Sequence, residues 1–266
     1  LDCVRALDVD DVVGGQFPLD IDRAPSAYDY SHGMGYTLGP FESEQEVTNI
    51  VGTDRWIPTM RFGVTQKNKT RGIDTARSNG VNDATIPREK MQLNTTDYNM
   101  GCVRKLNKLA PRMKLAAWVL DEKKAYRQIP VHPRNRRYSV VCMLHPVTGK
   151  VNFFVMIGHS FGLVSAVFNY NRRASLLTEL IRKAMAVPAL NYYDDKYGFD
   201  FEEFIGETLE TVKEFHTILG IDYDDVKTQA GQIVQVLGVR YDLDKLLVEI
   251  DEERKKMLII VRNKKK

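Results

Sequence analysis

Long apolar runs are absent from this 266-residue chain, in which no stretch approaches the ~18 residues that a membrane-spanning helix needs. We therefore expect no membrane partner. Cysteines are also scarce: Cys3, Cys102 and Cys142 are odd in number, widely spaced and form no C-x-x-C pair. This scarcity disfavours a zinc site or a disulfide framework. It is typical of a reducing compartment, so we expect an intracellular protein of the cytoplasm or nucleus.

A secretion signal, internal repeats and low-complexity segments are missing as well. A strong charge bias is absent too, because 38 basic and 35 acidic residues leave a net charge of +3. The distribution says more: basic residues cluster within 104–114, 123–137 and 254–266, whereas acidic residues gather within 194–210. A basic surface around an acidic pocket suits a metal-dependent enzyme that handles polyanions, while solvated helix faces would explain any single run.

The most informative stretch is Asn191–Phe199, which reads N-Y-Y-D-D-K-Y-G-F. Its aromatic residues flank the adjacent carboxylates Asp194 and Asp195, and the pattern predicts two short strands joined by a tight acidic turn. Neighbouring carboxylates repel each other, and a divalent cation would neutralise them. The alternative is an ordinary solvated turn, because Asp is common in turns.

A third carboxylate, Asp121, directly follows the apolar run Leu115–Leu120, which is short enough to be a buried strand. A carboxylate at the end of a buried strand emerges where a site can be built. The alternative role for Asp121 is the N-cap of the following turn, Glu122–Tyr126.

Hydrophobic periodicity and turn residues predict the remaining elements. Helices are expected over 42–51, within 87–113, over 163–186, over 203–219 and from 249 onward. Strand pairs are expected at 61–64 with 71–74, at 138–144 with 150–157, and within 233–241 around Gly238. The predicted core positions within 87–113 are Leu93, Tyr98, Val103, Leu106 and Leu109.

Taken in order, these motifs resemble those of the reverse transcriptases of retroviruses and long-terminal-repeat retrotransposons, over roughly residues 61–241. Val119–Pro130 resembles the family's first catalytic motif, an Asp followed by Ala-Tyr and then Ile-Pro. Phe161–Ala166 resembles the motif that contacts template and nucleotide. Tyr192–Asp195 resembles the Tyr-x-Asp-Asp motif, the most specific mark of the family.

The resemblance implies an α+β fold, the right-hand polymerase, with fingers, a palm whose antiparallel sheet is backed by helices, and a partial thumb. The implied boundaries are an N-terminal extension at 1–60 that stands alone or joins the fingers, fingers at 61–95, palm at 96–128, a fingers insertion at 129–160, palm with the primer-grip turn at 161–243, and the start of the thumb at 244–266. We interpret the chain as a fragment of a retroelement polyprotein, without RNase H, integrase or protease segments.

The implied activity is that of an RNA-directed DNA polymerase, which extends a primer on an RNA or DNA template with deoxynucleoside triphosphates. In-line nucleotidyl transfer needs an activated 3′-hydroxyl and a stabilised pyrophosphate, and two Mg²⁺ ions serve both, with Mn²⁺ as a substitute. The resemblance makes Asp121, Asp194 and Asp195 the metal ligands and catalytic residues. It also makes Lys227 a candidate proton donor to pyrophosphate, with an ordinary surface lysine as the alternative.

The implied nucleotide-binding residues begin with a cationic clamp, in which Arg71 with Lys67 or Lys69 grips the β- and γ-phosphates. Tyr126 would stack below the sugar and exclude a 2′-hydroxyl, which favours deoxynucleotides; a core tyrosine is the alternative.

Three further residues complete the implied nucleotide site. Phe161 would pack near the base and Gly162 would let backbone approach it, with a plain strand-to-helix corner as the alternative. Glu122 would contact a metal or phosphate through its backbone. The implied primer grip is the turn Leu237-Gly238-Val239.

Four positions depart from the family's usual pattern. Glu122 stands where an apolar residue is usual, and Gly72, Ser160 and Val167 stand where proline is common. None of the four removes a metal ligand. They leave open a degenerate or domesticated copy that binds nucleic acid without polymerising. An RNA-directed RNA polymerase is a second alternative, which Tyr126 disfavours. The oligomeric state is not indicated.

Overall fold

The computed structural model describes residues 36–66, 69–145, 147–250 and 255, with the side chains of 65–71 outside that description. The chain divides into two compact units, each described by itself. Unit 1 comprises residues 1–90 and 125–170, and unit 2 comprises residues 91–124 and 171–266. This division into two units does not test the predicted boundaries of fingers, palm and thumb, which stay a prediction.

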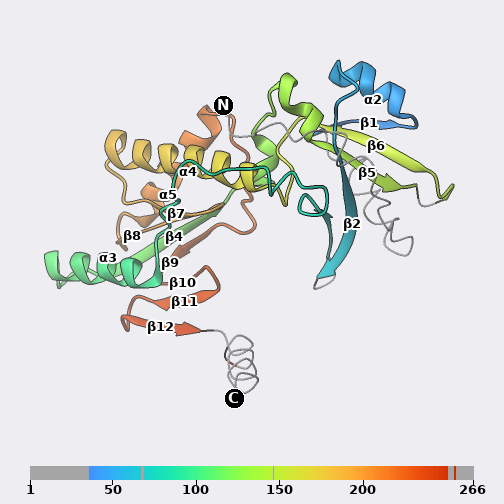
Figure 1. The fold of residues 1–266 in the computed structure, drawn as a ribbon. Coiled ribbons are helices and arrows are strands. Elements are labelled where there is room, and N and C mark those ends of the chain that lie inside the picture. Colours follow the sequence, from blue (N-terminus) through green and yellow to red (C-terminus); the bar gives the residue numbers. More distant parts are fainter. Residues whose placement is uncertain (1–35, 67–68, 146, 251–254, 256–266) are drawn as a thin grey trace. The chain divides into compact units, whose positions relative to one another are not determined.

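Unit 1 is built on a five-stranded sheet with the order β1-β6-β5-β2-β3 (Figure 1). Its strands are β1 (Thr37–Phe41), β2 (Pro58–Gln66), β3 (Lys69–Asp74), β5 (Val140–Leu144) and β6 (Val151–Met156). Strands β2 and β5 run parallel, and the other neighbours are antiparallel. The predicted strand pairs around 61–74 and 138–157 are therefore confirmed. Two short 3₁₀ helices, η3 (Ala125–Gln128) and η4 (Pro133–Tyr138), precede β5.

Helix α2 (Glu44–Val51) confirms the helix predicted at 42–51, and it packs on one face of this sheet. It begins at a capping box, in which Ser43 and Glu46 satisfy each other's backbone amides, and it ends at Gly52 with a φ of 74°. Val47 packs against Trp56 together with alternate residues of β5 and β6. The intervening residues of both strands form a second apolar cluster on the opposite face.

Unit 2 contains a four-stranded antiparallel sheet with the order β7-β8-β4-β9. Its strands are β7 (Leu190–Tyr192), β8 (Asp195–Phe201), β4 (Leu115–Asp121) and β9 (Gln229–Gly231). A second, three-stranded sheet is formed by β10 (Ile233–Val236), β11 (Val239–Asp242) and β12 (Leu247–Ile250). The helices are α3 (Thr96–Leu109), α5 (Ile205–Ile218) and, from residue 171 on, α4 (Val164–Ala184).

Strand β4 is buried on both faces, which explains its continuous apolar sequence. Its odd-numbered residues, Leu115 to Val119, pack with α3, β8 and the β10–β11 hairpin. Its even-numbered residues, Ala116 to Leu120, pack with α4 and α5. Figure 1 shows α3 on one side of this sheet and α4 on the other. Asp121 continues the odd-numbered series and Glu122 the even-numbered one, so the two carboxylates leave the strand in opposite directions.

Two sequence-based expectations need correction. The helix expected from 249 does not begin there, because Glu249 and Ile250 belong to β12; Lys255, the other described residue of that range, is helical. Tyr98 and Leu109 are 51% and 70% exposed rather than core residues, because α3 buries the neighbouring face that carries Val103. The other predicted helices are confirmed within a few residues.

No helix in the described part of the chain combines the length and apolarity that a bilayer crossing requires.

Gly198 on β8 marks the tightest packing of this sheet. A Cβ there would lie 2.0 Å from the carbonyl oxygen of Pro188 and 2.5 Å from Nε1 of Trp118, its partner on β4. Because backbone must move to admit a methyl group, we expect Gly198→Ala to lower the free energy of unfolding by about 3 kcal/mol, measured by urea denaturation.

Gly101→Ala on α3 is the matched control for this substitution. A Cβ there meets no atom within 4 Å, so alanine should raise the free energy of unfolding by about 0.5–1 kcal/mol. Equal shifts of the two variants in the same direction would contradict the packing described for Gly198.

Candidate functional site

The candidate site lies where the ends of β4 and β8 meet. Asp121, the last residue of β4, is the Cα partner of Asp195, the first residue of β8. Residues directly opposite each other on antiparallel strands project from the same face. Asp121, Asp194 and Asp195 all line one cavity of about 860 Å³, called the acidic cavity below. The structure therefore brings together the three carboxylates that the motifs single out.

The turn between β7 and β8 delivers Asp194 to this cavity. It consists of Tyr193 and Asp194, so the predicted hairpin with an acidic tip is confirmed. Tyr193 has a φ of 51°, a left-handed conformation that bulky residues rarely adopt. Its ring packs edge-on against Tyr192, with centroids 5.0 Å apart. A strained residue at the tip of a packed hairpin is typical of a functional turn.

A second hairpin tip lines the same cavity. Leu237 and Gly238 connect β10 to β11 with φ values of 56° and 69°, the combination of a type I′ turn. Together with Val239 they form the turn predicted as primer grip, and all three residues line the acidic cavity. The turn itself is confirmed, and its role stays a prediction.

The carboxylates at the cavity repel one another. Burial raises the pKa of Asp194, and the charges of Asp121 and Glu122 raise it further. Burial together with the charges of Asp194 and Asp121 raises the pKa of Asp195 to about 6. A bound cation would relieve this repulsion.

Lys227 reaches the site through a turn that is pinned to the end of β4. The backbone amide of Asp224 donates to the carbonyl of Asp121 at 2.9 Å, and that of Lys227 donates to Asp224 at 3.1 Å. Nζ of Lys227 then lies 2.5 Å from Oδ2 of Asp121 and 3.5 Å from a carboxylate oxygen of Asp224. The hydrogen bond to Asp121 raises the pKa of Lys227, so the ammonium keeps its proton while this pair is intact.

The chemistry of the donor set fits Mg²⁺, which prefers carboxylate oxygens and keeps water and substrate phosphates as its other ligands. Within the described residues, no group of three or more His, Cys, Asp and Glu side chains forms a preassembled metal site. Asp121, Asp194 and Asp195 are the residues that would hold the ions, with ligands from the nucleotide completing the coordination.

The side chain of Glu122 points away from the acidic cavity. It is 2% exposed, and its carboxylate pairs with Arg173 and with Lys196, the latter at 3.3 Å. These are contacts of the side chain, so the predicted contact between the Glu122 backbone and a metal or phosphate stays a prediction. The partners of Glu122 were missed by sequence reasoning, although Lys196 inside an otherwise apolar, aromatic strand was a usable signal.

Tyr126, Phe161 and Gly162 belong to unit 1. The ring of Tyr126 lies 5.1 Å from that of Phe161 and 4.7 Å from that of Tyr170, and the guanidinium of Arg127 lies over Phe161 at 5.5 Å. These contacts bring Tyr126 and Phe161, 35 residues apart in the chain (161 − 126), into one aromatic cluster. Tyr126 is buried with its ring held on two sides, which fixes its orientation.

Gly162 begins the corner that leads into α4. It has a φ of 94°, and a Cβ there would lie 2.3 Å from the carbonyl oxygen of Asp74. The Asn82 side chain holds the corner, since it donates to the Gly162 carbonyl at 2.7 Å and accepts from the Val164 amide at 2.9 Å. The close approach that requires glycine here is therefore to the backbone of β3.

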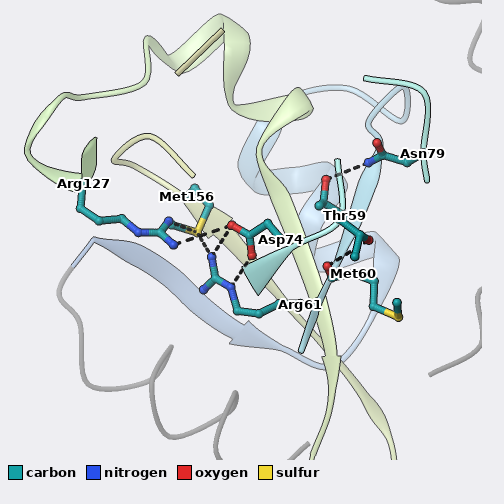
Figure 2. Close-up of polar contacts among 8 residues, drawn as sticks. Thr59, Met60, Arg61, Asp74, Asn79, Arg127 and Met156 are labelled. Atoms are coloured by element: carbon teal, nitrogen blue, oxygen red, sulfur yellow. Dashed lines mark hydrogen bonds and ion pairs between the residues drawn. The ribbon is translucent and has the colours of Figure 1, made fainter. Parts of the chain in front are cut away.

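A buried ionic cluster supports this corner (Figure 2). Arg61 donates to both carboxylate oxygens of Asp74, at 2.5 and 2.9 Å, and Arg127 lies 3.7 Å from the second oxygen. Both guanidinium groups also contact the sulfur of Met156 at 3.6 Å. Through Arg127, this cluster connects the β2–β3 hairpin to the ring of Phe161.

The predicted phosphate clamp falls largely outside the described side chains. Lys67 itself is outside the described residues. Lys69 and Arg71 lie on β3, opposite Gln66 and Val64, but their side chains are outside the description. Their role stays a prediction.

Sequence reasoning also missed the polar wall of the acidic cavity. This wall consists of Asn94, Thr95, Thr96, Gln229 and Gln235. Asn94 donates to the carbonyl of Asn191 at 3.1 Å, which ties the start of α3 to β7 beside the acidic turn. No local pattern marks these residues, because chain folding alone brings them to the cavity.

The raised pKa values predict how the stability of the chain depends on pH in the absence of divalent cations. Folded Asp195, with its pKa of about 6, holds a proton more tightly than in the unfolded chain, where the value is near 4. The folded state therefore binds more protons between about pH 4 and pH 6, and the free energy of unfolding falls as pH rises through that window. Asp195→Asn should remove this fall and stabilise the chain at pH 7, by on the order of 1 kcal/mol after solvent screening.

Urea denaturation in a chelator, repeated across this pH range, measures the effect. Asp244→Asn, which neutralises an exposed carboxylate outside the cavity, is the control for removing one negative charge. Parallel pH profiles of Asp195→Asn and the wild-type chain would contradict the repulsion inferred at the site.

Comparison with known proteins finds similarity in fold. No protein-family profile matches the chain. No curated protein sequence matches it either. Among solved structures, a foamy-virus protease–reverse transcriptase in complex with double-stranded DNA is similar, with a TM-score of 0.65 and 15% sequence identity. The similarity covers 91% of this chain and 38% of the viral chain, so the chain spans well under half of that relative. The chain thus has a mixed α/β fold similar to that of a reverse transcriptase.

Proposed function

We propose that the chain is the polymerase core of a reverse transcriptase, which adds deoxynucleotides to a primer on an RNA or DNA template. One observation carries this proposal: Asp121 and Asp195 face each other across β4 and β8, and Asp194 lines the same cavity. Carboxylates from separate strands that converge on an open cavity are what two-metal nucleotidyl transfer requires. The fold similarity to a viral reverse transcriptase supports the same activity.

In this proposal the three aspartates would hold two Mg²⁺ ions, whose chemistry when bound would be to lower the pKa of the primer hydroxyl and to neutralise charge on the leaving pyrophosphate. Asp121 and Asp195 are fixed by strand pairing, whereas Asp194 is fixed by the left-handed turn at Tyr193. Lys227 holds a proton at Nζ on the wall of the cavity and is the candidate donor to pyrophosphate.

The primer end is proposed to rest against the turn Leu237-Gly238-Val239, which lines the acidic cavity. Among the described residues that line this cavity, Lys227 is the only cationic one. The polar wall of the cavity, which includes Asn94, would offer hydrogen-bond donors to the primer strand. The viral relative was solved with double-stranded DNA, and a primer–template duplex is the corresponding partner proposed for this chain.

The nucleotide itself is proposed to use residues of unit 1. Tyr126, whose ring packs against those of Phe161 and Tyr170, would exclude a 2′-hydroxyl, and Phe161 would pack near the base. Lys67 or Lys69, with Arg71, would clamp the triphosphate. In the vocabulary of right-hand polymerases, unit 1 would supply the fingers, the β7-β8-β4-β9 sheet the palm, and the chain after β11 the start of the thumb.

Asp194→Asn is the central test of this proposal. Loss of a metal ligand removes several kcal/mol of transition-state stabilisation, so we expect primer extension with Mg²⁺ to fall by about a thousandfold or more. Asp225→Asn, at a surface carboxylate that pairs with Lys213, should leave extension unchanged.

Binding of the same primer–template is measured beside extension. Wild-type binding without extension would favour the degenerate, non-catalytic copy. Full extension by Asp194→Asn would remove the two-metal assignment.

Tyr126 is the test of sugar selection. Tyr126→Ala should lower the preference for deoxynucleoside over ribonucleoside triphosphates at least about tenfold, measured as the ratio of kcat/KM values, because the ring that blocks the 2′-hydroxyl is gone. Tyr126→Phe keeps the ring and is the matched control. An unchanged ratio in Tyr126→Ala would count against the role of this residue, and a wild-type preference for ribonucleotides would favour an RNA polymerase.

A further inference from the structure

The face of the β4–β8 pair that points away from the acidic cavity also carries charge. On this face Ala116, Trp118 and Leu120 pack into an apolar cluster with α4 and α5. Glu122 continues the same series and has a side chain with no exposed surface. Lys196 is the Cα partner of Leu120 and is 1% exposed, so it projects into the same layer. Glu122 and Lys196 are thus fully buried charges on this face, whereas Asp200, at its other end opposite Ala116, is partly exposed.

Four side chains from four elements meet in this layer. Oε1 of Glu122 lies 3.3 Å from Nζ of Lys196 on β8 and 3.7 Å from Nε2 of His216 on α5. Oε2 of Glu122 accepts a hydrogen bond from Arg173 on α4. His216, completely buried, is oriented by a contact of 2.7 Å between its Nδ1 and the carbonyl of Val212. Glu122 is therefore the common partner of the other three.

Burial makes each member depend on the others. Desolvation alone would raise the pKa of Glu122, yet the nearby His216 and the charges of Lys196 and Arg173 lower it to about 2. Burial lowers the pKa of Lys196, and Glu122 opposes that change. Removing Glu122 would leave Lys196 as a buried cation without its carboxylate, and removing Lys196 would leave Glu122 with Arg173, whose side chain is 23% exposed. Either loss should be more destabilising than replacing Glu122 and Lys196 together by apolar residues.

The position of this cluster in the sheet gives it a second consequence. Glu122 directly follows Asp121, and Lys196 directly follows Asp195, so each buried charge shares backbone with a carboxylate of the acidic cavity. A slip of β8 by one residue would move Lys196 into the cavity and Asp195 into the apolar layer. The pairing of Glu122 with Lys196 opposes that slip, because it is formed only in the observed register.

We propose that Glu122 and Lys196, with Arg173 and His216 around them, are positioning residues that hold Asp121 and Asp195 in register for cation binding. The role in cation binding rests on the function proposed above, whereas the register role does not. Supporting side chains behind a metal site typically change its affinity 10–100-fold when they are lost.

Glu122→Val, Lys196→Leu and the double variant form the test. Tb³⁺ alone is the probe, since it binds hard oxygen ligands and its luminescence is sensitised by nearby tyrosines such as Tyr192 and Tyr193. Each single variant should lower the urea midpoint by about 1 M or more. On the folded baseline, each should also raise the Tb³⁺ concentration for half-saturation about tenfold. The double variant should return to within about twofold of wild-type affinity, because the two fully buried charges are removed together and Arg173, whose side chain is 23% exposed, can reach solvent.

Two reference variants complete the design. Asp194→Asn identifies the Tb³⁺ bound at the cavity. Glu179→Gln, which breaks an exposed ion pair with Arg182 on α4, should change neither midpoint nor affinity.

Wild-type Tb³⁺ affinity in folded single variants, or no recovery in the double variant, would overturn the proposal. If the single variants do not fold, a folded double variant with wild-type affinity supports it and an unfolded one overturns it. Neither the urea midpoint nor the Tb³⁺ affinity requires polymerisation. If the chain passes this test but extends no primer, the proposed function is wrong and the positioning role of Glu122 and Lys196 still stands.

Discussion

The antiparallel pairing of β4 with β8 is the constraint on which the candidate site depends. Side chains alternate along a strand, so one register assigns every residue of both strands to one of two faces. In the observed register, Asp121 and Asp195 share the face that opens to the acidic cavity. The opposite face receives Trp118, which fits under α4 and α5 only because Gly198 has no side chain. Site geometry and core packing are thus two consequences of one pairing.

Each unit contains a buried ionic cluster close to a turn that the motifs single out. In unit 1, Asp74 holds Arg61 and Arg127 beneath the corner at Gly162. In unit 2, Glu122 and Lys196 lie beneath the acidic turn. Buried ion pairs add little net stability compared with apolar residues of similar size, because desolvation offsets the attraction. They do restrict the arrangements that a chain can adopt, since any alternative that separates the partners leaves a charge unpaired. A site that needs carboxylates at fixed places is where such a restriction is useful.

Local signals in the sequence predicted the parts of this site that local structure determines. The run Leu115–Leu120 predicted a buried strand, and the aromatic residues around Asp194 predicted the hairpin. The order of the motifs predicted that distant carboxylates would converge. Interactions between elements were beyond such reasoning, because nothing near Glu122 in the chain indicates Arg173 or His216 as its partners.

Errors in the sequence-based interpretation have the same origin. The spacing of apolar residues in α3 fits two adjacent stripes, and only contact with the sheet decides that Val103 is buried while Tyr98 and Leu109 are not. Residues 249–250 fit a helix by composition, but β11 offers them an antiparallel partner, and the pairing of Arg240 with Glu249 places them in β12. Tertiary context overrides local propensity wherever that propensity is weak.

Glu122 bears on whether the candidate site is intact, because it is one of the positions that depart from the family pattern the motifs resemble. By resemblance, the position after the first catalytic aspartate is usually apolar, so a buried glutamate there looks like damage when the sequence is considered alone. An unpaired carboxylate at that depth would be strongly destabilising. Instead Arg173, Lys196 and His216, from three different elements, converge on it. Arg173 and Lys196 supply the opposite charge that the burial of this carboxylate requires. The departure at Glu122 therefore favours a divergent site that has kept its geometry over one that has lost it.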